Sequence, residues 1–155
     1  MKRSEKKLGA ILVDSGVITE TQLEDALEEQ KITKEYLGAI LVNKQYASET
    51  NILKALALQF NLPVISVKNI KIDWNLTKQF SPSLVLQDKC FPIKKEEFSI
   101  TVAIINPLDA FVLKRAEDES RGLRVRFVLV SLADMEELIR QYKQFMRGIV
   151  FGKLE

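Results

Sequence analysis

Apolar positions recur at helical spacing from the start of the chain. Leu8, Ile11 and Leu12 fall at i, i+3 and i+4, which predicts a short helix with one buried face. Gly16 follows where the end of a helix usually takes a left-handed residue. A second apolar stripe then repeats at the same spacing through Leu23, Ala26, Leu27 and Gln30. The pattern predicts a helical hairpin.

This hairpin is written twice. The segments Lys7–Gln30 and Tyr36–Gln59 align without a gap and share 11 of 24 residues, with residues 31–35 as the spacer. A repeat of this length decides the architecture before any single residue does. Residues 36–59 are therefore expected to form a second hairpin, and its more apolar second helix should be buried on more sides. Leu12, Leu27, Leu41 and Leu56 should all be substantially buried.

Polar residues mark where the helices begin and end. Thr19 with Gln22 three residues later predicts a capping box, and Ser48 is the equivalent cap in the second copy. Pro63 disfavours helical backbone at the residue before it, so the last helix of the repeat should end near Asn61.

After residue 62 the pattern alternates between strand and helix periods. Strands are expected at 64–67, 91–94, 99–105 and 124–130, and helices at 73–80, 82–89, 107–120 and 132–146. In the strand at 124–130, Arg124 and Arg126 should face outward. Asn106 is expected to cap a helix that begins at Pro107, with Asp109 in its first turn.

The fold class that follows is α/β (α+β). Tandem helical hairpins with four short helices make up a subdomain at 1–61. A small α/β sandwich-like subdomain follows at 62–146, and 147–155 is a tail.

Composition narrows the function. The net charge of +2 gives no strong field toward nucleic acid or anionic lipid, and no apolar run is long enough to insert into a membrane. One cysteine and no histidine argue against a metal site or a disulfide, and suggest a cytoplasmic protein. No phosphate-binding loop, dinucleotide fingerprint or nucleophile elbow is present. We therefore expect neither an enzyme nor a cofactor.

Two interpretations of the repeat remain open on the residues alone. The stripes fit a self-packing platform of four helices. Gly9 and Gly38, however, occupy helix positions where alanine would be more stable by roughly 1 kcal/mol, which suggests close approach of another group to the backbone. A basic cluster beside the first helix start also suggests an anion, and consists of Lys2, Arg3, Lys6 and Lys7.

The doubled L-G-A-I-L-V motif with its five-residue spacer resembles the MshEN-type N-terminal domain of type II secretion and type IV pilus assembly ATPases, the GspE/PilB family. N-L-P after the second copy, F-P-I, and T-V-A-I-I-N-P-L-D agree with that family, so the resemblance covers about residues 7–143. It implies a non-catalytic regulatory or docking module. The implied partners are inner-membrane platform components or an ATPase engine domain, which would hold a cytoplasmic protein at the periphery of the inner membrane.

Some members of that family bind cyclic-di-GMP along the two motifs. Carried over by position, the resemblance implies a set of ligand-binding candidates in both copies. They are Lys7, Leu8, Gly9, Leu12, Val13, Gly16, Leu23, Leu27 and Gln30, then Tyr36, Leu37, Gly38, Leu41, Val42, Leu56 and Gln59.

Three positions depart from the family pattern. Lys7 and Tyr36 stand where the motif has arginine, and Gln45 stands where it has glycine. Lysine lacks the planar fork of arginine, and tyrosine lacks the charge. With these departures, the resemblance implies a docking module whose cyclic-di-GMP site is degenerate. The alternatives are a fully functional cyclic-di-GMP sensor and a helix-turn-helix DNA binder. DNA binding is disfavoured because the helix after Thr19 is acidic.

Overall fold

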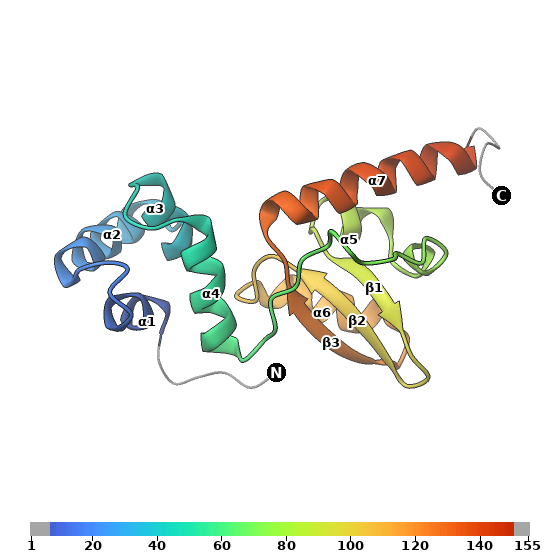
Figure 1. Ribbon diagram of the computed structural model, residues 1–155, viewed down its shortest axis with the longest axis horizontal. Coiled ribbons are helices and arrows are strands. Elements are labelled where there is room, and N and C mark those ends of the chain that lie inside the picture. Colours follow the sequence, from blue (N-terminus) through green and yellow to red (C-terminus); the bar gives the residue numbers. More distant parts are fainter. Residues whose placement is uncertain (1–6, 151–155) are drawn as a thin grey trace. The chain divides into compact units, whose positions relative to one another are not determined.

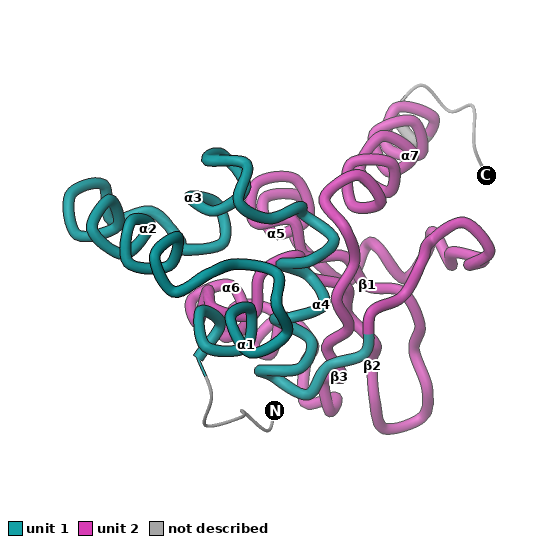
Figure 2. Tube along the Cα trace, turned by 60° about the vertical axis from the view of Figure 1, so that its left-hand side comes forward, with its two compact units in different colours: residues 1–63 teal, residues 64–155 magenta. Residues whose placement is uncertain are grey.

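The computed structural model describes the backbone of residues 7–150 and the side chains to residue 148. The chain divides into two compact units, residues 1–63 and 64–155 (Figure 2). The architecture is α+β, as the sequence predicts (Figure 1).

The first unit consists of two helical hairpins. The first hairpin contains α1 (Leu8–Asp14) and α2 (Glu20–Thr33), and the second contains α3 (Leu37–Asn43) and α4 (Glu49–Phe60). The first helix of each copy packs against the second helix of the other, because α1 contacts α4 and α2 contacts α3. The repeat is thus an interlocked pair of hairpins.

The predicted helix signals of this unit are confirmed. Thr19 and Gln22 form a capping box, with Thr19 N–H donating to Gln22 Oε1 at 2.9 Å and Gln22 N–H donating to Thr19 Oγ1 at 3.1 Å. Ser48 caps α4 in the same way through Asn51. Asn61 ends α4 in the left-handed conformation.

Burial differs between the second helices of the two copies. Leu12, Leu41 and Leu56 are buried, but Leu27 is 38% exposed, so the prediction of burial is wrong at Leu27. In α2 only Ala26 is buried, whereas five residues of α4 are, as expected for its more apolar sequence. The acidic side chains of α2 favour contact with water, so most of the helix surface stays exposed.

The second unit is built on a small mixed sheet of order β1-β2-β3. Strand β1 (Phe91–Lys95) pairs antiparallel with β2 (Ser99–Ile104), and β2 pairs parallel with β3 (Arg124–Leu129). The crossover from β2 to β3 runs through α6 (Ala110–Glu119). Arg124 and Arg126 are exposed as predicted, and the C-terminal half of β3 is buried.

Three helical segments complete this unit: the 3₁₀ helix η1 (Leu76–Gln79), α5 (Pro82–Leu86) and α7 (Leu132–Val150). The helix predicted at 73–80 is thus only one 3₁₀ turn, and the helix predicted at 82–89 ends early because Lys89 is left-handed. Helix α7 extends past the predicted end at 146, and the remainder of the predicted tail, 151–155, lies outside the described residues.

The strand predicted at 64–67 is wrong. Val64 makes one isolated parallel bridge to Leu129, and Ile65 N–H donates to the backbone carbonyl of Leu129 at 2.9 Å. Val67 N–H then donates to Asp134 Oδ2 at 3.2 Å, which draws the backbone from the edge of β3. The side chain of Asp134 thus accepts the hydrogen bond that a neighbouring strand would otherwise accept from Val67.

The helix predicted from Pro107 also begins elsewhere. Asn106 Oδ1 accepts from Leu108 N–H at 2.9 Å, which makes a turn, and Asp109 Oδ1 caps α6 by accepting from Val112 N–H at 3.2 Å. The predicted cap at Asn106 is wrong because the proline follows a turn-forming asparagine here, and the acid after it satisfies the helix.

Polar and aromatic contacts hold the second unit together. Arg115 of α6 pairs with Asp88 and Glu119 and donates to Ser81 Oγ at 3.1 Å, so one guanidinium ties α6 to the start of α5. Trp74 stacks on Phe145 with ring centroids 5.7 Å apart.

Cys90 is fully buried beside β1, and burial raises the pKa of its thiol to about 12. The thiol therefore stays protonated and unreactive in the folded unit.

Candidate ligand site on the duplicated hairpins

The two hairpins begin with the same backbone geometry. Lys7 and Tyr36 are the N-caps of α1 and α3, both in extended conformation and neither making a side-chain cap. Both side chains reach solvent, and Tyr36 is 48% exposed. The positions where the family pattern has arginine are therefore accessible. Lys2, Arg3 and Lys6 of the basic cluster lie outside the described residues.

The repeated glycines have a packing reason within the unit. Both are buried, and a Cβ on Gly9 would lie 2.7 Å from Leu23 Cδ1. A Cβ on Gly38 would lie 2.8 Å from Ile52 Cγ2. Leu23 and Ile52 are equivalent residues of the two copies, so each glycine lets the second helix of its own hairpin pack closely. Helix packing, without a ligand, accounts for them.

The turns inside the two hairpins also match. Gly16 has φ +78° and Gln45 has φ +62°, so the left-handed position is kept where glycine is replaced. Gly16 N–H donates to Val13 O at 3.0 Å, and Gln45 N–H donates to Val42 O at 2.9 Å. Gln45 is thus strained by about 1 kcal/mol, as expected for a residue with a Cβ in this region.

A cluster that sequence analysis missed anchors the strained turn. Tyr46 Oη donates to Asp25 Oδ2 at 2.6 Å, and Lys44 Nζ lies 3.0 Å from the same oxygen. Lys44 Nζ also lies 3.8 Å from Glu29 Oε1. The residues on both sides of Gln45 are therefore fastened to α2 of the other copy. Gly16 of the first copy has no such neighbours, because Ser15 and Val17 stand where the second copy has Lys44 and Tyr46.

Mutual contact shifts the titration of this cluster. The hydrogen bond from Tyr46, followed by that from Lys44, lowers the pKa of Asp25. The hydrogen bond to Asp25 raises the pKa of Lys44 and that of Tyr46. At neutral pH the carboxylate is charged and the phenol holds its proton, which is the combination that the geometry requires.

Burial separates the sixteen candidate residues into two groups. The accessible group, exposed or half-buried, comprises Lys7, Val13, Gly16, Leu23, Leu27, Gln30, Tyr36, Leu37 and Val42. The buried group comprises Leu8, Gly9, Leu12, Gly38, Leu41, Leu56 and Gln59. Only the first group offers side-chain or backbone surface without rearrangement. Ligand binding by either group stays a prediction.

The two glutamines that close the stripes have different surroundings. Gln30 Nε2 donates to Glu35 O at 3.0 Å and its side chain remains half-buried. Gln59 is 2% exposed, and its Oε1 has no hydrogen-bond partner among the described residues. A buried amide oxygen in this state is unfavourable by about 1–3 kcal/mol, and a donor from a ligand or a water would relieve it.

The surface that this unit presents is suited to binding. Among the candidate residues, apolar side chains such as Val13 and Val42 are half-buried and Lys7 is exposed, a combination that can cover a flat base and attract an anion. Among the described residues no group of three or more histidine, cysteine, aspartate or glutamate side chains could hold a metal ion.

Comparison with known proteins identifies relatives. Residues 60–149 match the sequence pattern of the MshEN domain family. They contain the end of α4 and most of the second unit. The type IV pilus assembly ATPase PilB of Thermus thermophilus is 28% identical over 116 residues, or 74% of this chain. PilB of Myxococcus xanthus is 24% identical over 136 residues, or 88% of this chain. The chain spans only 13% and 24% of the lengths of these two relatives.

Solved structures resemble the chain over most of its length. A structure of MshE with cdg has a TM-score of 0.82 at 28% identity and covers 89% of this chain and 99% of that one. The N-terminal domain of XpsE has a TM-score of 0.71 at 15% identity, covers 92% of this chain and 97% of that one, and shows a shared fold.

No helix among the described residues is long and apolar enough to cross a lipid bilayer. The MshEN family match covers more than half of the sequence, and the solved structure of MshE covers 89% of the chain, so the family resemblance stated from the sequence is confirmed. The chain belongs to the MshEN domain family.

Proposed function

We propose that this chain is a non-catalytic regulatory and docking module of a pilus or secretion ATPase, and that its duplicated hairpins form a weakened cyclic-di-GMP site. The observation that carries the proposal is the likeness to MshE with cdg, at a TM-score of 0.82 over 89% of this chain. The named relatives are pilus assembly ATPases, and the larger part of each lies outside the match.

The geometry of the repeat supports this ligand. Cyclic-di-GMP has two guanines and two phosphates related by a two-fold axis, and each half can meet one hairpin. Lys7 and Tyr36 occupy equivalent accessible positions, and so do Gly16 and Gln45. Half-buried Val13 and its equivalent Val42 offer apolar surface to a base or a ribose.

The same geometry explains why binding should be weak. Neither helix start has an arginine that could fork to the O6 and N7 acceptors of guanine. The loss of two such contacts, at roughly 1–3 kcal/mol each, reduces affinity by orders of magnitude. The glutamine at φ +62° also places a side chain where the pattern has none.

Isothermal titration of the chain with cyclic-di-GMP tests the proposal, with GTP and ATP as controls. The triple variant Lys7→Arg, Tyr36→Arg, Gln45→Gly should gain at least about tenfold in affinity, because each arginine adds a planar donor fork. The gain should be specific for guanine and should shrink with added salt.

Two results would separate the alternatives. Tight binding by the unmodified chain would show a fully functional sensor, since Lys7 and Tyr36 would then suffice. A folded triple variant that ignores cyclic-di-GMP would contradict the ligand site and leave docking to an inner-membrane platform component or to the ATPase engine as the function.

A further inference from the structure

The second unit has a hollow of about 350 Å³ between α5 and the C-terminal half of α7. Figure 1 shows α7 running past α5 on this side of the unit. The lining residues are Pro82 and Leu86 of α5, and Tyr142, Lys143, Met146 and Arg147 of α7.

The floor of the hollow is apolar. Leu86 and Met146 are half-buried, and Tyr142 is only 2% exposed. Exposed apolar surface of this kind gains free energy when another apolar group covers it. The volume is at the lower end of the range of ligand pockets and has room for apolar side chains of a partner.

The rim of the hollow is cationic. Lys143 and Arg147 are exposed and lie at i, i+4, so they project from the same face of α7 about one turn apart. Neither forms an ion pair within the described part of the chain, and no carboxylate belongs to the lining.

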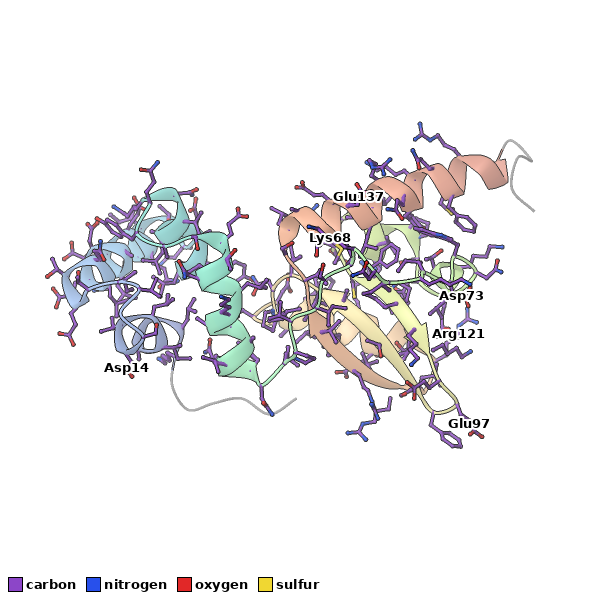
Figure 3. All side chains as sticks on the ribbon, viewed as in Figure 1. Asp14, Lys68, Asp73, Glu97, Arg121 and Glu137 are labelled. Carbon is purple, nitrogen blue, oxygen red and sulfur yellow. The ribbon has the colours of Figure 1, made fainter. Side chains whose placement is uncertain are left out.

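Arg140, one turn before Lys143, provides a contrast. Arg140 Nε donates to Glu137 Oε2 at 2.9 Å, and this contact lowers the pKa of Glu137 to about 2. Glu137, labelled in Figure 3, thus neutralises the arginine nearest to it on α7. The two cations at the hollow keep their charge available.

We propose that this hollow is the docking surface for an acidic amphipathic helix of a partner protein. An apolar side chain of that helix enters between Leu86 and Met146, and two of its carboxylates, spaced one turn apart, meet Lys143 and Arg147. Charge complementarity and the matching helical spacing identify the occupant. The inference rests on the docking part of the proposed function and is independent of cyclic-di-GMP.

A fluorescent synthetic helix made of leucine, alanine and glutamate serves as the probe, and its anisotropy is measured with the full chain. The double variant Lys143→Glu, Arg147→Glu should weaken binding at least about tenfold, because attraction becomes repulsion. The variant Arg124→Glu, Arg126→Glu makes the same charge change on exposed residues of β3 and should bind like the unmodified chain. Leu86→Ser should weaken binding without changing any charge.

Several results would overturn the proposal. They are absence of binding, equal loss in the β3 variant, equal binding of a lysine-containing helix, and displacement of the probe by vesicles of anionic lipid. Tighter binding after removal of residues 151–155 would also overturn it, since the chain's own end would then be the occupant. Titration of Lys143→Glu, Arg147→Glu with cyclic-di-GMP keeps the two sites apart, because a lost docking site leaves that affinity unchanged.

Discussion

The two hairpins of the first unit have the same backbone conformation but differ in how deeply their second helices are buried. Caps, turn hydrogen bonds and the glycine contacts agree position by position. Yet α4 buries five residues and α2 only Ala26, and a strained glutamine replaces glycine in the second turn. Both copies contribute to the core through their first helices, and the copies differ in their second helices, of which α4 is largely buried and α2 largely exposed.

The largest difference between the copies should appear at Leu56 and its equivalent Leu27. Leu56 is 6% exposed and Leu27 is 38% exposed. Leu56→Ala should lower the free energy of unfolding by about 2–5 kcal/mol through the lost burial and the cavity, and Leu27→Ala by about 1 kcal/mol. Urea denaturation followed by far-UV circular dichroism measures both. Equal losses would show that the two stripes are equally buried in solution.

The glycine contacts predict a second difference. Gly38→Ala drives its Cβ against Ile52 Cγ2, a branch fixed close to the backbone of a buried residue, whereas Gly9→Ala meets the free end of half-buried Leu23. We expect Gly38→Ala to destabilise the unit by about 1–2 kcal/mol. Gly9→Ala should be near neutral, because the gain in helix propensity offsets the crowding. The same urea titration decides, and the reverse order would refute the packing account.

Substitutions in the two turns should change the stability of the unit in opposite directions. Gly16→Ala places a Cβ at φ +78° and should destabilise the unit by about 1 kcal/mol. Gln45→Gly removes the penalty at φ +62° and should stabilise it by up to about 0.5 kcal/mol, since the glycine also loosens the unfolded chain. Thermal unfolding of the two variants side by side provides the measurement. Destabilisation by Gln45→Gly would mean that the side chain itself contributes.

The smallest effect concerns the Asp25 cluster, which the first copy's turn lacks. The folded pKa of Asp25 is lowered from 3.8, so its stabilisation is present above pH 3.8 and is lost as the pH falls through the lower folded value. Asp25→Asn should therefore flatten the acid side of the stability profile, measured by urea midpoints from neutral pH to about pH 2. Tyr46→Phe should restore the ordinary titration in part. An unchanged profile in both variants would show that the cluster does not form in solution.

Local signals predicted much of this fold. The helix caps at Thr19 and Ser48 and the left-handed Gly16 depend on neighbours within a few residues, and the structure has them where the sequence predicts them. The sequence patterns of β1, β2 and β3 were also sufficient, whereas the strand predicted at 64–67 is replaced by a single bridge. The cap of α6 was misplaced because Asn106 and Asp109 carry nearly the same signal and only the backbone path selects between them.

The candidate site was less predictable because it depends on long-range contacts. Tyr46 and Asp25 are far apart in sequence, and no periodicity pairs them. The repeated glycines suggested a ligand near the backbone, but the group that approaches Gly9 is Leu23 of the same hairpin. The exposure of Leu27 depends on which helix α2 packs against, and the stripe alone does not contain that information.

The buried thiol of Cys90 has a practical consequence for measuring these units separately. The sequence contains one cysteine, and it belongs to the second unit. With its pKa raised to about 12 and its side chain inaccessible, it can react with an alkylating reagent only when that unit opens. The rate of alkylation therefore measures how often the second unit opens, independently of the first. Substitutions in the hairpins that leave this rate unchanged act within the repeat, and those that accelerate it reveal energetic coupling between the two units.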